Sequence, residues 1–145
     1  MALKIGSFIA YVIAVLGIVF LFFRHTIFSD NPVAISIQAG AVALMIWARI
    51  TFGFRSFHAL ANTTQGGLVT NGPYHFLRHP VYASVIYFCW ATLISFPLAE
   101  TLAAVLVVTG GLFARMVLEE KFLYAAYDGY AAYAAKTKRI IPYLF

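Results

Sequence analysis

Charged side chains are scarce in this chain of 145 residues. Lys, Arg, Asp and Glu together make up 10% of it, whereas soluble globular proteins carry about 25%. Hydrophobic residues reach 63%, and the mean hydropathy is +0.87. Cysteine is also scarce, because Cys89 is the only one, which excludes a disulfide-stapled scaffold. Too few charges are present to cover a surface that faces water, so the composition predicts a polytopic membrane protein.

Four apolar stretches predict membrane-spanning helices, which need about 20 residues each, with about 17–25 tolerated. They cover residues 5–23, 33–47, 80–96 and 98–118; the second extends to 54 on a wider reading, and the third is short. The first resembles a signal peptide in position, but no small-residue cleavage site follows it. Pro97 separates the last two, so we expect a tight helical hairpin there. Gly110-Gly111 would allow a neighbouring helix to come close.

Basic residues predict the orientation, because Lys and Arg in short loops favour the cytoplasmic side. With a cytoplasmic N-terminus, nine of the ten fall inside and only Arg24 falls outside. The nine are Lys4, Arg49, Arg55, Arg78, Arg115, Lys121, Lys136, Lys138 and Arg139. The net charge of +5 therefore indicates topology and contact with anionic lipid rather than nucleic-acid binding. Both termini and any chemistry are expected at the cytoplasmic face.

The C-terminal tail predicts a helix of another kind. Residues 119–136 contain no proline and are rich in alanine, and Tyr127, Tyr130 and Tyr133 recur every three residues. Tyrosine and basic side chains prefer the headgroup region. We therefore expect an interfacial amphipathic helix, for which a plain membrane anchor is the simpler interpretation. The whole chain, 1–145, is expected to form a single domain.

The densest polar cluster is Gly72-Pro73-Tyr74-His75-Phe76-Leu77-Arg78-His79-Pro80-Val81-Tyr82. A residue before proline avoids the helical region, so His79 should be extended or a helix cap and should not share a helix face with His75. A metal site is therefore disfavoured. Pro80 suits the first helical position, where free N–H groups can meet a polar ligand. Gly66-Gly67 and Gly72 would let the backbone approach that ligand. An ordinary interfacial loop is the equal alternative.

Arg115, Glu119 and Glu120 form a second polar group at the end of the fourth span. Arg115 and Glu119 are four residues apart, so they share a helix face and can pair. Ionisable groups at membrane depth are candidates for function, whereas an interfacial ion pair that only ends the helix is the simpler alternative.

The ordered motifs resemble the isoprenylcysteine carboxyl methyltransferase family, which is related to the membrane phospholipid methyltransferases. The matching residues cover about 68–142 and are Leu68-Val69-Thr70-Asn71-Gly72-Pro73-Tyr74, Arg78-His79-Pro80-Val81-Tyr82, Glu119-Glu120, Tyr130, Tyr133, Arg139 and Pro142. The chain departs from the family's pattern in two places. Ser84 stands where the family usually has a glycine, and the segment between Glu120 and Tyr130 is one residue shorter than in the family.

The resemblance implies S-adenosylmethionine as methyl donor and a lipophilic acceptor, either a carboxylate such as a prenylated cysteine or a lipid amine. The residues it assigns to the cofactor are Leu68, Val69, Tyr74, His79, Pro80, Tyr82 and Glu119. It assigns Arg115 to the acceptor as the catalytic residue. A carboxylate acceptor needs orientation rather than a general base, whereas an amine must lose a proton, for which His79 or Glu120 is the nearest candidate.

Two other functions compete with a methyltransferase. A small four-helix transporter would place an acid inside a span to couple ions, but all five acids lie at span ends or outside them. A membrane-anchor subunit would leave the ordered motifs without a role. The sequence therefore favours an all-α integral membrane enzyme with about four spans and a C-terminal interfacial helix.

Overall fold

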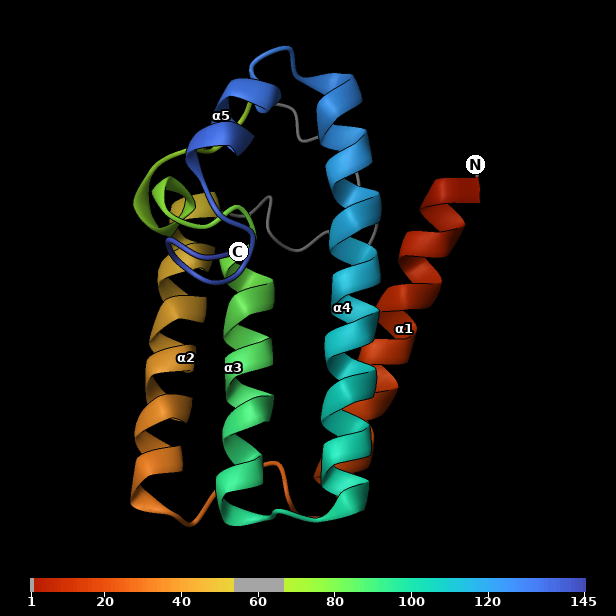
Figure 1. Ribbon diagram of the computed structural model, residues 1–145, viewed down its shortest axis with the longest axis vertical. Coiled ribbons are helices and arrows are strands. Elements are labelled where there is room, and N and C mark those ends of the chain that lie inside the picture. The colour runs from red at the N-terminus through yellow and green to blue at the C-terminus, as the bar shows by residue number, and fades with distance from the viewer. Residues whose placement is uncertain (1, 54–66) are drawn as a thin grey trace.

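The computed structural model describes residues 2–53 and 67–145, and about three quarters of these are helical (Figure 1). The elements in chain order are α1 (Ala2–Phe23), α2 (Pro32–Phe52), the 3₁₀ turn η2 (Gly72–His75), α3 (Pro80–Ser95), α4 (Ala99–Ala126) and α5 (Tyr130–Lys136). Arg55 and Gly66, which entered the predictions above, lie outside the described residues. The described part contains no strand, which confirms the all-α prediction.

Three of the helices are long and apolar enough to cross a membrane: Leu3–Phe23, Pro32–Phe52 and Ala99–Ala126. The third predicted span is the shorter apolar helix α3. Large apolar side chains such as Leu16, Phe23 and Ile50 are more than half exposed on the outer surface. Such an apolar surface suits contact with lipid chains rather than with water. The prediction of an all-α membrane protein is confirmed.

Helix α2 begins where Asn31-Pro32 predicted it. The Asn31 Oδ1 accepts hydrogen bonds from the backbone N–H groups of Val33 at 2.9 Å and Ala34 at 3.4 Å. An N-cap side chain of this kind satisfies donors that have no partner within the helix. Pro32 follows at the first helical position, where its missing N–H costs nothing.

The helices pack as two neighbouring pairs, α1 with α4 and α2 with α3 (Figure 1). Small residues bring α1 and α4 close together. A Cβ on Gly17 would lie 2.7 Å from Val108 Cγ2, and one on Gly111 would lie 2.8 Å from the Ala10 carbonyl oxygen. Gly110 has no such neighbour, so only the second glycine of the predicted pair serves the close approach.

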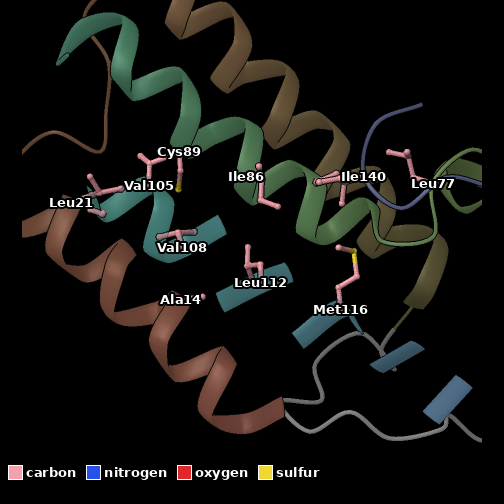
Figure 2. Close-up of a cluster of buried hydrophobic side chains, with 12 residues drawn as sticks. Ala14, Leu21, Leu77, Ile86, Cys89, Val105, Val108, Leu112, Met116 and Ile140 are labelled. Carbon is pink, nitrogen blue, oxygen red and sulfur yellow. The ribbon is translucent and has the colours of Figure 1, made fainter. Parts of the chain in front are cut away.

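A buried hydrophobic cluster runs along the inside of α1, α3 and α4 (Figure 2). Leu21 and Val105 lie toward one end of it, and Leu112 and Met116 continue it along α4. Leu77 and Ile140 join the same cluster from outside the spans. The core therefore connects the helical body with the loop before α3 and with the C-terminal tail.

Helix α4 differs from its predicted length. It has 28 residues and measures about 42 Å at 1.5 Å per residue, against about 30 Å for the hydrocarbon core of a bilayer. No proline or glycine occurs between Gly111 and Gly129 to end it earlier. The predicted single helix over residues 119–136 is therefore wrong: its first part continues α4, and α5 starts only after a break at 127–129.

Candidate active site

The start of α3 has the local geometry that its sequence predicted. His79 has a non-helical backbone with φ −128° and ψ 59°, and Pro80 occupies the first helical position. The His79 carbonyl oxygen accepts the first helical hydrogen bond, from the Ala83 N–H at 2.9 Å. His75 belongs to η2, so the two histidines do not share a helix.

The C-terminal tail runs beside this loop and is fixed to it by the backbone. The Arg78 N–H donates to the Lys138 carbonyl oxygen at 2.7 Å, and the His79 N–H donates to the Arg139 carbonyl oxygen at 3.1 Å. The Lys138 N–H returns a hydrogen bond to the Phe76 carbonyl oxygen at 3.1 Å. These bonds place Arg139, far along the chain, next to the start of α3.

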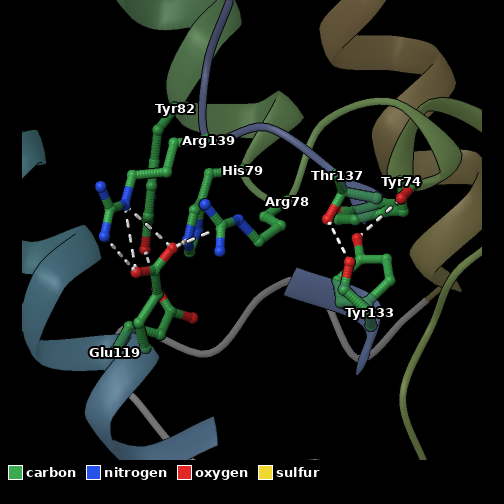
Figure 3. A network of polar contacts seen from close by, with 9 residues as sticks. Tyr74, Arg78, His79, Tyr82, Glu119, Tyr133, Thr137 and Arg139 are labelled. Atoms are coloured by element: carbon green, nitrogen blue, oxygen red, sulfur yellow. Dashed lines mark hydrogen bonds and ion pairs between the residues drawn. The ribbon is translucent and has the colours of Figure 1, made fainter. Parts of the chain in front are cut away.

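One group of charges, the Glu120 cluster, consists of Glu120 and its three ion-pair partners Arg78, His79 and Arg139, and Figure 3 shows these three partners side by side. The Glu120 carboxylate accepts from Arg139 Nη2 at 3.0 Å and Nε at 3.1 Å, lies 3.3 Å from His79 Nε2, and lies 3.5 Å from Arg78 Nε. Glu120 is only 4% exposed. Its hydrogen bond raises the pKa of the Arg139 guanidinium above the ordinary value. This cluster ties α4, the loop and the tail together.

A second group, the Glu119 cluster, consists of Glu119, Tyr82 and Arg115. The Tyr82 hydroxyl donates to Glu119 Oε2 at 2.6 Å and accepts from Arg115 Nε at 2.7 Å. The predicted partnership of Arg115 with Glu119 thus includes a bridge through a residue of α3. The ring of Tyr82 stacks on His79, with centroids 5.4 Å apart and planes at 11°, so the two clusters are neighbours.

Two tyrosines of the tail, Tyr130 and Tyr133, pack against the rest of the chain. Tyr130 is 1% exposed, and the Tyr133 hydroxyl donates to the Tyr74 carbonyl oxygen at 2.7 Å (Figure 3). Burial raises the pKa of Tyr130, and it raises the pKa of Tyr133 to about 12. Both hydroxyls therefore stay protonated. Tyr133 thus attaches α5 to η2, and the Tyr130 ring packs edge-on against Tyr124 near the end of α4, with the centroids 4.7 Å apart.

The structure gathers six of the eight predicted site residues at one end of the bundle. The four buried ones are Tyr74, His79, Pro80 and Arg115, and the two half-buried ones are Tyr82 and Glu119. Leu68 and Val69 are half-buried in the irregular segment that leads to η2. The sequence did not predict that Arg78 and Arg139 pair with Glu120. The signal was present, because the same motifs contain two arginines and two adjacent acids, which can form a network of ion pairs.

Two buried donors in this region, one of them in the Glu120 cluster, make no hydrogen bond to the described residues. They are the Tyr130 hydroxyl and Arg78 Nε, whose 3.5 Å contact with Glu120 is an ion pair without a hydrogen bond. Buried polar atoms in folded proteins nearly always have a partner, in the chain, in water or in a ligand. This end of the bundle therefore combines buried donors that make no hydrogen bond, a half-buried carboxylate and aromatic faces, and this combination suits a site for a small polar ligand.

The fold and this group of residues define a helical membrane protein with a polar site at one end of its spans. The comparisons with known proteins give the family. The model of the phospholipid methyltransferase family matches residues 31–129, more than half of the chain. The chain therefore belongs to the phospholipid methyltransferase family, the membrane methyltransferases related to the isoprenylcysteine carboxyl methyltransferases. No curated protein and no solved structure matches the chain.

Proposed function

We propose that this protein transfers a methyl group from S-adenosylmethionine to a lipophilic acceptor at the end of the bundle where the two clusters lie. The Glu119 cluster carries the proposal, because it joins a carboxylate, a hydroxyl and a guanidinium from two helices in hydrogen bonds of 2.6 and 2.7 Å. Ala99 and Glu119 are 20 residues apart on α4, about 30 Å, which equals the thickness of the hydrocarbon core. The site would thus lie at headgroup depth, where a lipid presents its polar group.

The residues present suit this cofactor. We assign Leu68, Val69, Tyr74, His79, Pro80, Tyr82 and Glu119 to it. A carboxylate such as Glu119 can accept from a hydroxyl or ammonium group, and the buried Tyr130 hydroxyl, which makes no hydrogen bond to the described residues, can donate to a carboxylate. Aromatic faces attract a cation such as a sulfonium.

When bound, S-adenosylmethionine would supply an electrophilic methyl group, so the chain mainly has to position the acceptor. Arg115 would orient an acceptor oxygen that carries negative charge, since guanidinium groups bind carboxylates and phosphates through paired hydrogen bonds. A carboxylate acceptor requires no further group. For an amine acceptor, His79 would be the nearest base: its Nε2 lies 3.3 Å from Glu120 and donates to that ionised carboxylate, so the proton would go to the other ring nitrogen, Nδ1.

We further propose that chain 1–145 acts as one domain with four spans and with both termini in the cytoplasm. The N-terminus of α1, α5 and the C-terminus lie toward the same end of the bundle (Figure 1). Of the nine Lys and Arg residues that the structure describes, eight belong to segments on that side in this topology, and Arg24 does not. Reporter fusions after Phe28 and after Phe145 should report opposite sides of the membrane. A report from the same side would overturn the four-span topology.

The proposed activity is tested with purified protein in lipid nanodiscs and S-adenosylmethionine labelled in its methyl group. Dioleoylphosphatidylethanolamine supplies an amine acceptor, and N-acetyl-S-farnesylcysteine supplies a carboxylate acceptor. We expect label in one of the two lipids with the wild type, and strongly reduced label with Glu119→Gln, which keeps the size of the side chain and removes its charge. The matched control is Arg24→Gln at the opposite end of the bundle. Label in neither lipid would contradict the proposal.

A further inference from the structure

The guanidinium of Arg115 lies against the first helix as well as against α3. Its Cζ is 5.0 Å from the centroid of the Tyr11 ring, and its Nη1 donates to the Ser7 carbonyl oxygen at 3.4 Å. A cation within about 6 Å of an aromatic centroid is attracted to the face of the ring. Arg115 also donates a hydrogen bond of 2.7 Å to the Tyr82 hydroxyl of α3. Its guanidinium is therefore held by contacts from α1 and from α3, and the residue is only 4% exposed.

Helix α1 lies outside the part of the chain that matches the family, which begins at residue 31. Its sequence is otherwise apolar and indicated only a membrane span. The structure nevertheless fixes Tyr11 beside Arg115, because the same stretch of α1 packs tightly on α4. Gly111 lies one helical turn before Arg115. A Cβ on Gly111 would collide with Ala10 and Ala14 of α1, which lie close to Tyr11 in that helix, so the two helices are in close contact at this level.

From this geometry we infer that Tyr11 is a positioning residue for Arg115, and that α1 thereby forms part of the acceptor side of the site. The inference rests on the proposed function. It also indicates the class of acceptor, namely a lipid with a negatively charged oxygen at headgroup depth, as in a carboxylate or a phosphodiester.

The kind of contact supports this role. The Tyr11 ring, the Ser7 carbonyl oxygen and the Tyr82 hydroxyl are neutral groups, so these three contacts orient the guanidinium without themselves bringing an opposite charge to it. A ring face also replaces water at a depth where an ionised group is costly to bury. Tyr11 is 38% exposed, so it supports Arg115 from the rim of the helix pair rather than from within the apolar core.

Steady-state kinetics test the inference with whichever of the two lipids the wild type methylates. Tyr11→Leu should raise the KM for the lipid about tenfold, with kcat and the Kd for S-adenosylmethionine changed less than threefold. Tyr11→Phe keeps the ring and should restore the wild-type KM. Phe8→Leu, a matched loss of a ring from the lipid-exposed surface of the same helix, should have no effect. An unchanged KM in Tyr11→Leu, or an equal rise in Tyr11→Phe or Phe8→Leu, would overturn the inference.

A stability measurement separates this inference from the proposed activity. Thermal unfolding is compared for Tyr11→Leu, Arg115→Met and the double variant. If the ring holds the guanidinium, the two Tm shifts are not additive, and the double variant is no less stable than Arg115→Met. Additive shifts would refute the contact between Tyr11 and Arg115 whether or not the protein methylates either lipid. Failure of methylation together with non-additive shifts would instead refute the proposed function alone.

Discussion

Glu119 and Glu120 are consecutive residues of α4, yet they belong to different surroundings. Successive residues of a helix point about 100° apart, so one carboxylate reaches α3 and the other reaches the tail. Glu120 is surrounded by Arg78, His79 and Arg139 and is 4% exposed. Glu119 is half-buried and joins Arg115 through the hydroxyl of Tyr82.

The different burial and partners of the two carboxylates indicate different roles for the two clusters. The Glu120 cluster connects three segments distant in sequence, and its carboxylate oxygens are occupied by side chains of the chain itself. Its primary contribution is to hold the tail against the loop before α3. The Glu119 carboxylate is more accessible than that of Glu120 and belongs to a chain of three hydrogen-bonded polar groups, so it is the better place for a ligand. Loss of Glu120 should therefore affect stability first, and loss of Glu119 should affect binding first.

The largest expected effect is that of Glu120→Ala. It leaves Arg78 and Arg139 buried or partly buried without their carboxylate, and breaking such a group typically costs about 3–5 kcal/mol of stability. Unfolding by denaturant in detergent micelles measures the free energy of unfolding. Glu120→Gln, which keeps two polar atoms at the same place, should lose less. A stability equal to that of the wild type in both variants would remove the structural role of this cluster.

The next effect concerns Arg115 and the acceptor. Arg115→Ala should lower kcat/KM for the lipid about ten- to a hundredfold, because a hydrogen bond to a charged group is worth about 1.5–3 kcal/mol. The Kd for S-adenosylmethionine should stay within a few fold. Arg115→Lys keeps the charge but loses the planar geometry, and should show a smaller loss. A loss of cofactor binding in both variants would show that Arg115 acts on the cofactor side.

A smaller effect is expected from Tyr133→Phe. The Tyr133 hydroxyl donates to the Tyr74 carbonyl oxygen at 2.7 Å, and an ordinary hydrogen bond contributes about 0.5–1.5 kcal/mol. The change should lower the free energy of unfolding by about that amount. Its effect should stay below that of Glu120→Ala, because no charge is left unpaired. A larger loss than that of Glu120→Ala would place the main attachment of the tail at α5 instead of at Arg139.

The smallest effect should come from the opposite end of the bundle. Arg24 Nε donates to Glu100 Oε1 at 3.0 Å, but both side chains are substantially exposed, at 52% and 39%. Exposed ion pairs are worth about 0–1 kcal/mol, so Arg24→Gln should change neither the unfolding curve nor methylation by much. A loss of stability comparable with that of Glu120→Ala would mean that the burial of an ion pair does not decide how much it contributes at either end of the bundle.

Much of the fold was predictable because its signals are local. Long apolar stretches gave the spans, Asn31-Pro32 gave the start of α2, and His79-Pro80 gave the start of α3. The length of α4 was missed because the charges at Glu119 and Glu120 suggested a membrane boundary, whereas a helix ends only where its backbone is interrupted, here at 127–129.

The candidate residues were also predictable, but their partners were not. The resemblance supplied Tyr82, Glu119 and Arg115 by position along the chain, without the bridge through the Tyr82 hydroxyl. The pairing of Arg139 with Glu120 depends on how the tail folds back onto the loop, which no spacing in the sequence encodes. The contact of Tyr11 with Arg115 depends on the packing of α1 on α4, and an apolar helix gives no local signal for its partner.

The central claim is that Glu119, together with Tyr82, holds the cofactor of a methyltransferase, and isothermal titration with S-adenosylmethionine tests it most directly. The protein is titrated both in detergent and in lipid nanodiscs, as wild type and as Glu119→Gln, with Arg24→Gln as control. Saturable binding is predicted for the wild type and the control. Glu119→Gln should bind about ten- to a hundredfold more weakly, because it loses a charged acceptor. No saturable binding by the wild type in either medium, or equal affinity in Glu119→Gln, would contradict the claim.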